Sequence, residues 1–164
     1  MKIGILADTH NDIKNTQRAM QVFSNHQVGL LIHCGDVTSV TTLKWLSEFP
    51  IILTFGNGDV FSGEMKAYLE SLDMDCVAGY KYEGELGGKR IAASHGHLSE
   101  INNSILSEQT FDFFFHGHTH EKVDRWVGRT RVINPGAVMA IGKSIGSVCV
   151  LDLAGGELIF ETLS

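Results

Sequence analysis

The chain has 164 residues, of which 43% are hydrophobic, and it carries a net charge of −6 at pH 7 with no basic cluster. This length supports one buried core and is too short for two ordinary domains, so we expect a single domain over residues 1–164. The acidic balance argues against a nucleic-acid polymer or a membrane as partner, and the apolar stretches fall far short of the roughly 18 residues that span a bilayer.

The first half of the chain alternates apolar runs with segments whose apolar residues recur at helical spacing. Three strand and helix pairs are predicted there, over 2–7 and 12–24, 28–33 and 39–49, and 51–55 and 64–72. This order predicts parallel strands joined by right-handed crossovers.

The second half favours strands. They are predicted over 76–82, 90–94, 111–115, 122–126, 131–133, 147–153 and 158–162, with one helix over 99–108. We therefore expect two packed sheets with helices outside them.

The beginning of the chain, residues 1–7, is too short for a secretory apolar region. Three widely spaced cysteines, Cys34, Cys76 and Cys149, form no CxxC pair and are expected to be reduced. We therefore expect a soluble cytoplasmic protein. The exposed strand edges of the second half would permit a homo-oligomer.

Short polar clusters directly follow five of the predicted strands. They are Asp8-Thr9-His10, Gly35-Asp36, Gly56-Asn57-Gly58-Asp59, His95-Gly96-His97 and Gly117-His118-Thr119-His120. Because loops converge outside the carboxyl ends of parallel strands, these side chains are expected to meet at one edge of the fold.

The chemistry of these clusters suits two divalent cations. Asp8 and His10 alternate around one residue, as do His118 and His120, so each pair can face a common point. The two oxygens of Asp36 can bridge metals about 3.5 to 4 Å apart, and Asn57 offers a neutral amide oxygen. Mixed imidazole and carboxylate ligands favour manganese first, with nickel, iron or zinc also suitable.

The series DxH, GD, GNxD, HGH and GHTH, in this order, resembles the calcineurin-like metallophosphoesterase superfamily, and the short chain resembles its small YfcE-like phosphodiesterase branch. The resemblance extends from Asp8 to a turn at Asn134, Pro135 and Gly136. It implies an α/β fold, a four-layer αββα sandwich with two mixed β-sheets, and a dinuclear metal centre.

The resemblance also implies the ligands and the reaction. One metal would be held by Asp8, His10, Asp36 and His120, and the other by Asp36, Asn57, His95 and His118. A hydroxide bridging the ions would attack phosphorus, so that the chain would be a metal-dependent phosphodiesterase with Asp36 and Asn57 in its catalytic centre.

One position departs from the superfamily pattern. Many members carry a histidine after the asparagine of GNxD, where it is thought to protonate the leaving group, whereas this chain has Gly58. General acid catalysis contributes about 10² to 10⁴ in rate, so its loss favours small-molecule phosphodiesters or esters with acidic leaving groups. His97 is a substitute acid or, alternatively, a histidine that only supports the site or faces solvent.

Four further polar residues have ordinary explanations. His26, His33 and His116 are better explained by capping, packing or hydrogen bonding than by metal ligation. Asp59 would either orient a ligand imidazole or cap the turn before the helix at 64–72.

Several other functions compete with the phosphodiesterase. They are a phosphomonoesterase of the same fold, a non-catalytic interaction scaffold like a retromer subunit, a TIM-barrel metal hydrolase, and a nucleotide or flavin binder. All seven predicted ligand positions are filled, which argues against a scaffold. A TIM barrel needs about 250 residues. No GxGxxG or Walker loop follows the first predicted strand, which argues against a nucleotide binder.

Overall fold

The computed structural model describes residues 1–140, 142 and 144–164. In chain order the elements are β1 (Lys2–Leu6), α1 (Ile13–Asn25), β2 (Leu30–His33), α2 (Val40–Leu46), β3 (Ile51–Thr54), α3 (Ser62–Glu70), β4 (Val77–Gly79), β5 (Lys81–Leu86), β6 (Lys89–Ser94), α4 (Ser99–Glu108), β7 (Phe113–Phe115), β8 (Lys122–Val127), β9 (Thr130–Pro135), β10 (Ser147–Asp152) and β11 (Leu158–Thr162).

The strands form two mixed sheets. The first has the order β11-β10-β1-β2-β3-β4, in which β1 to β4 run parallel and β10 and β11 are antiparallel additions. The second has the order β5-β6-β7-β9-β8. Its three central strands β6, β7 and β9 run parallel, and the edge strands β5 and β8 are antiparallel to them. The parallel strands of each sheet therefore end at a common edge.

Alternating side chains divide the core of the first sheet between its two faces. Leu31 of β2 packs with Ala19 and Phe23 of α1 in a cluster that also contains residues of α2 and α3. Its neighbour Ile32 faces the other way and packs with Phe115 of the second sheet. This period of two is what a strand buried on both faces requires.

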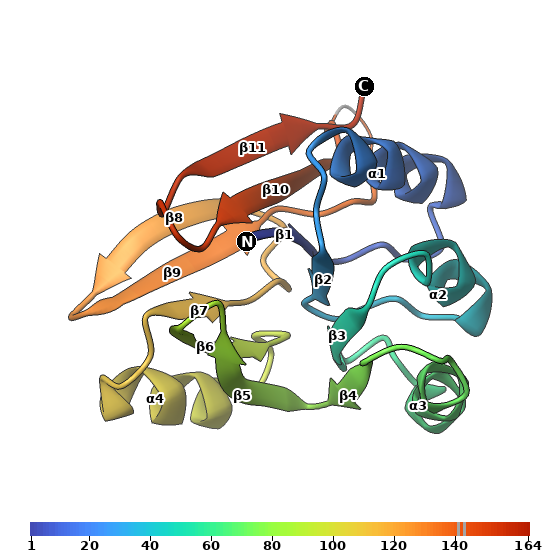
Figure 1. The fold of residues 1–164 in the computed structure, drawn as a ribbon. Helices are drawn as coiled ribbons and strands as arrows, with labels where there is room; N and C mark the ends of the chain where they lie inside the picture. Colours follow the sequence, from blue (N-terminus) through green and yellow to red (C-terminus); the bar gives the residue numbers. More distant parts are fainter. Residues whose placement is uncertain (141, 143) are drawn as a thin grey trace.

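The outer face of the second sheet is covered by α4. Ile105 of this helix packs against Ala92, Phe114 and Val132. Figure 1 shows α1, α2 and α3 on one side of the molecule and α4 on the other, so the layers run helix, sheet, sheet, helix. The predicted αββα sandwich with two mixed sheets is confirmed.

The prediction of a single strand over 76–82 is wrong. The chain pairs Val77 with Ile52 in the first sheet, and then pairs Lys81 with Ser94 in the second. The change of sheet occurs at Tyr80, which is exposed and stacks edge-on against Phe55. One apolar run therefore supplies two short strands, a division that local patterning cannot reveal.

The part of β5 over residues 83–86, which pairs with β6 in a hairpin, was not predicted from the sequence. Its exposed side carries Glu83 and Glu85, so the segment lacks the apolar content on which the prediction relied. The turn uses Gly87 and Gly88, both with positive φ, as a two-residue hairpin loop requires. The helix predicted over 39–49 is shorter than expected and ends at Leu46.

Among the described residues, no helix is both long and apolar enough to cross a membrane.

Candidate metal centre

Two buried carboxylates at the carboxyl ends of β1 and β2 are each shared by two imidazoles. Asp36 Oδ2 lies 3.4 Å from His10 Nε2 and 3.6 Å from His95 Nε2. Asp8 Oδ1 lies 3.4 Å from His120 Nε2 and 3.9 Å from His10 Nε2. The loops after β1, β2, β6 and β7 thus bring nitrogen and oxygen donors to one place, as predicted from the strand order.

These donors form two overlapping groups. Asp8, His10 and His120 make one, and Asp8, Asp36 and His95 make the other, with the donor atoms of each group within 4.8 Å of one another. Asp8 belongs to both groups. Asp36 also faces an imidazole of each group, with Oδ2 3.4 Å from His10 Nε2 and 3.6 Å from His95 Nε2.

The two other predicted ligands, His118 and Asn57, lie in the loops after β7 and β3. His118 is exposed, with its ring centroid 5.0 Å from that of His95, and its backbone N–H donates to Asp8 Oδ2 at 3.0 Å. Asn57 lies exposed in the turn after β3. The next residue, Gly58, donates its N–H to Asp36 Oδ1 at 2.7 Å, which places this turn beside the carboxylate.

Two buried polar atoms at the centre have no hydrogen-bond partner in the described structure, namely Asp8 Oδ1 and His95 Nε2. His95 Nδ1 donates to the carbonyl of Cys34 at 2.7 Å, which leaves the Nε2 lone pair directed at the centre. Buried polar atoms are almost always paired. A carboxylate oxygen and an imidazole lone pair that both lack a hydrogen-bond partner at the same centre therefore fit a bound cation.

The protonation of the centre without metal follows from its burial. Burial, together with the nearby charges of Asp36 and Asp59, raises the pKa of Asp8 to about 7 against the opposing hydrogen bond from the His118 N–H. Burial also lowers the pKa values of His95 and His120, which keeps both imidazoles neutral. Neutral imidazoles can donate their lone pairs to a metal. A bound cation would also stabilise the ionised form of Asp8, which is costly in this buried place on its own.

The backbone around these side chains is strained. Asp8, Asp36, His118 and His120 have φ values of 55°, 57°, 69° and 59°, in the left-handed region that non-glycine residues rarely adopt. Such strain persists only where the surroundings impose it, and it concentrates at functional sites. Gly56 is required for a different reason, because a Cβ there would overlap Asp36 Oδ1.

Asp59 holds the backbone of the β2 loop. Its Oδ2 accepts the N–H groups of Asp36 and Gly56 at 2.9 and 2.8 Å, and its Oδ1 accepts the N–H of Thr38 at 2.7 Å. The bond to Gly56 closes the turn before α3, which is one of the two roles predicted for Asp59. The bonds to Asp36 and Thr38 reach the β2 loop, which neither predicted role included.

His33 supports the site from beneath. Its Nδ1 accepts the N–H of Gly35 at 3.1 Å, so Nε2 carries the proton and donates to Thr9 Oγ1 at 3.2 Å. The Thr9 hydroxyl donates to the Asp36 carbonyl at 3.3 Å. Burial lowers the pKa of His33 to about 3, so this histidine stays neutral.

Asn134, near the end of β9, is a positioning residue, a role that was not predicted although the residue belongs to the turn that ends the family resemblance. Its buried side-chain amide donates to the Gly117 carbonyl at 2.9 Å and to Thr119 Oγ1 at 3.1 Å, and so holds the loop that carries His118 and His120. The sequence contained an indication of this role, because Asn134 lies near the carboxyl end of another parallel strand that meets the same edge of the fold.

His97 lies near the centre, with its ring centroid 5.2 Å from that of His95 and 6.1 Å from that of His118. Its Nδ1 is buried without a hydrogen-bond partner in the described part of the chain. His116 instead stacks on Phe114, with its Nδ1 near the Asn134 amide, as expected for a packing residue.

The sequence features that define the calcineurin-like phosphoesterase superfamily domain match residues 1–156. The chain belongs to this superfamily. Phosphodiesterase MJ0936 of Methanocaldococcus jannaschii is 30% identical over 154 residues, which cover 93% of both chains. Probable metallophosphoesterase YsnB of Bacillus subtilis is 24% identical, with 96% of this chain and 95% of the relative covered.

A solved structure of an archaeal phosphodiesterase matches with a TM-score of 0.93 at 30% identity, covering 99% of this chain and 100% of the other. The Escherichia coli phosphoesterase YfcE matches over the whole of both chains with a TM-score of 0.69 at 21% identity, which shows a shared fold. These relatives confirm the resemblance to the superfamily and support a phosphoester hydrolase.

Proposed function

We propose that this chain is a dinuclear-metal-dependent phosphodiesterase that hydrolyses a small-molecule phosphodiester, with residues 1–164 acting as one domain. The observation that carries the proposal is the pair of donor groups that share Asp8, in which Asp8 and Asp36 each face two imidazole nitrogens. The relative named as a phosphodiesterase supports the same reaction class.

The proposed ligands are those that the resemblance implied: Asp8, His10, Asp36, Asn57, His95, His118 and His120. Manganese is the first choice for such donors, with nickel, iron and zinc also compatible. When bound, a metal pair lowers the pKa of water and offsets negative charge on phosphoryl oxygens.

The chain itself prepares Asp36 for this role. Asp59 holds its backbone, and the N–H of Gly58 holds its Oδ1, so that Oδ2 remains directed at His10 and His95. Asn57 would present its amide oxygen from the adjoining turn. For protonation of the leaving group we propose His97, because it is half-buried beside His95 with an unpaired Nδ1 among the described atoms.

The preference for diesters over monoesters rests on Gly58. A Cβ at this position would lie 3.1 Å from Cγ of Asp36, so the turn is closely packed around the carboxylate. Gly58 has no side chain that could protonate a leaving group. A phosphomonoesterase of the same fold is the second candidate. The cytoplasm as compartment and a homo-oligomeric state remain proposals from the sequence.

The test strips metal from the purified protein, adds back manganese, nickel, iron or zinc separately, and measures hydrolysis of bis(p-nitrophenyl) phosphate and p-nitrophenyl phosphate. We expect metal-dependent activity with about two ions per chain and a higher rate on the diester. Asp36→Asn should lose metal and activity, whereas Asp73→Asn, in the exposed turn after α3, is the matched control. Full metal content and wild-type activity in Asp36→Asn would refute the proposal.

A further inference from the structure

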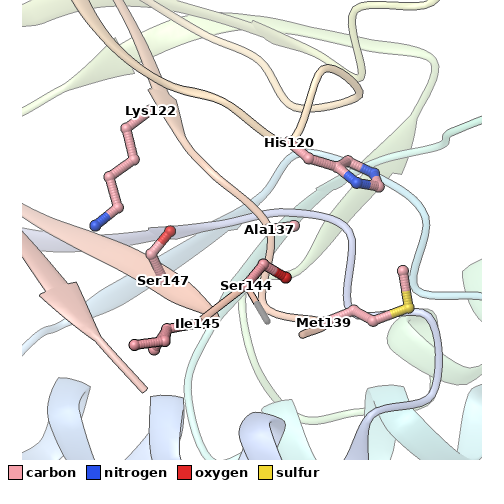
Figure 2. A pocket seen from close by; sticks show the side chains of 7 residues that line it. All are labelled: His120, Lys122, Ala137, Met139, Ser144, Ile145 and Ser147. Carbon is pink, nitrogen blue, oxygen red and sulfur yellow. The ribbon is translucent and has the colours of Figure 1, made fainter. Parts of the chain in front are cut away.

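A hollow opens directly beside the metal centre. It has a volume of about 130 Å³ and is lined by His120, Lys122, Ala137, Met139, Ser144, Ile145 and Ser147. Figure 2 shows His120 on one side of it and Lys122 on the other, with Ala137 between them. His120 also faces Asp8 Oδ1 at 3.4 Å, so one imidazole belongs to both the hollow and the centre.

The hollow is fixed to the centre through the backbone. The N–H of Met139 donates to the carbonyl of Asp8 at 3.0 Å, and the N–H of Val138 donates to the carbonyl of Ala7 at 2.9 Å. The segment that forms one wall is therefore bonded to the same turn that carries a proposed ligand. A phosphorus atom held at the centre would have one of its ester groups next to this wall.

The hollow is partly apolar. Figure 2 shows Met139 on the side of His120 and Ile145 on the side of Lys122 and Ser147, and Ile145 leaves 62% of its surface exposed. Ser147 contributes little polarity, because its hydroxyl already donates to the carbonyl of Pro135 at 2.7 Å. Among the described residues that line the hollow, Lys122 carries the ammonium charge.

Lys122 carries an ammonium that no carboxylate of the described residues approaches within 4 Å. The ammonium lies over the ring of Phe160, with Nζ 5.8 Å from the ring centroid. The stem passes Gly136, where a Cβ would lie 3.3 Å from Lys122 Cγ. An unpaired cation at the end of a partly apolar hollow is suited to an anionic group on a short carbon chain.

We propose that this hollow binds one alcohol group of the phosphodiester substrate, and that this group is short and ends in an anion, a carboxylate or a phosphate, held by Lys122. The inference rests on the proposed function and narrows its substrate class. Its volume of about 130 Å³ is below the roughly 300 Å³ of pockets that enclose a whole organic ligand, so it accommodates a group of a few carbons rather than a nucleoside.

The kinetic test uses three p-nitrophenyl phosphodiesters whose second alcohol group is propyl, 2-carboxyethyl or 2-phosphonoethyl. We expect KM for at least one anionic ester to be about three- to tenfold lower than for the propyl ester at low salt, as for a partly exposed ion pair. Lys122→Met should abolish this ratio and Lys122→Arg should keep most of it. Lys89→Met, which removes the same charge at the start of β6, should keep it fully.

A binding experiment gives a readout independent of turnover. In zinc-loaded protein, which is diamagnetic, the methyl signals of Ile145 and Met139 should shift at lower concentrations of 3-phosphonopropanoate than of propylphosphonate. In Lys122→Met the two compounds should titrate alike. Equal titration in the wild-type protein would overturn the assignment of the hollow.

The proposed function and the proposed role of the hollow are refuted by different outcomes. If none of the three esters is hydrolysed by metal-loaded protein, the proposed phosphodiesterase function is wrong, and the methyl titration still decides what the hollow binds. If all three are hydrolysed with the same KM, the function stands and the role of Lys122 is wrong.

Discussion

The carboxylate of Asp59 accepts the backbone N–H of Asp36 at 2.9 Å, and this bond connects the β3 turn to the residue that lies between two imidazoles at the metal centre. Asp59 makes two further bonds, to the N–H groups of Gly56 and Thr38. It is therefore a positioning residue for the carboxylate of Asp36.

Asp59→Asn should weaken metal binding without removing a ligand. The amide keeps one acceptor oxygen but turns an NH₂ group toward a backbone N–H, which breaks at least one bond to a charged acceptor. We expect about 10- to 100-fold lower metal affinity, measured by isothermal titration of metal-free protein. Asp73→Asn is the control. Unchanged affinity in Asp59→Asn would show that the turn does not depend on this carboxylate.

Without metal, the stability of the protein should depend on Asp8. Its pKa is raised to about 7 in the fold by burial, against an ordinary value near 4, so between about pH 4 and 7 the folded chain holds a proton that the unfolded chain has lost. The contribution of Asp8 to the free energy of unfolding therefore falls as pH rises through this window, on the order of a few kcal/mol. His33, whose pKa is lowered to about 3, acts in the opposite direction below pH 6.5.

The contribution of Asp8 is isolated by comparison with Asp8→Asn. Urea unfolding of both proteins in EDTA, from pH 4.5 to 8, should show the variant gaining stability relative to the wild type as pH rises. Addition of manganese at pH 8 should stabilise the wild type more than the variant. A constant difference across the pH range would mean that Asp8 does not titrate in this window.

His33 should contribute to stability rather than to metal content. His33→Leu leaves the buried N–H of Gly35 without a partner and removes one of the two bonds of the Thr9 hydroxyl, which costs about 1 to 3 kcal/mol. His33→Asn can still accept the Gly35 bond and should cost less. Urea unfolding measures both variants, and metal stoichiometry at saturating manganese should equal that of the wild type. A loss of ions from a folded His33→Asn protein would give His33 a direct role at the centre.

The sequence predicted the centre better than its surroundings, for a physical reason. Asp8 and Asp36 each follow a buried parallel strand, and the carboxyl ends of such strands converge whatever the details of packing. The sharing of Asp8 between both donor groups depends on side-chain directions that spacing does not encode. The hollow beside His120 joins residues from β8, β10 and the segment between β9 and β10, so only the tertiary fold reveals it.

Local patterning also failed where two sheets compete for one segment. The run around Tyr80 has the apolar content of one strand, and its division between β4 and β5 depends on which neighbouring edges are free. Asn134 illustrates the same limit for function, because its role comes from contacts with a loop 15 to 17 residues earlier in the chain.

Gly58 tests the explanation for the preference between diesters and monoesters. Because a Cβ there would lie 3.1 Å from Cγ and Oδ1 of Asp36, any side chain forces the carboxylate to move by a few tenths of an ångström. Gly58→Ala should therefore lower the rates on diester and monoester alike, and it serves as the reference for Gly58→His. Relative to Gly58→Ala, the histidine should raise the monoester rate more than the diester rate, by about tenfold, which is less than the 10² to 10⁴ of a well-placed acid. Steady-state kinetics with an alkyl phosphomonoester and an alkyl phosphodiester, whose basic alkoxide leaving groups need a proton, supply both rates. Equal changes on the two substrates would remove the absent acid as the cause of the preference.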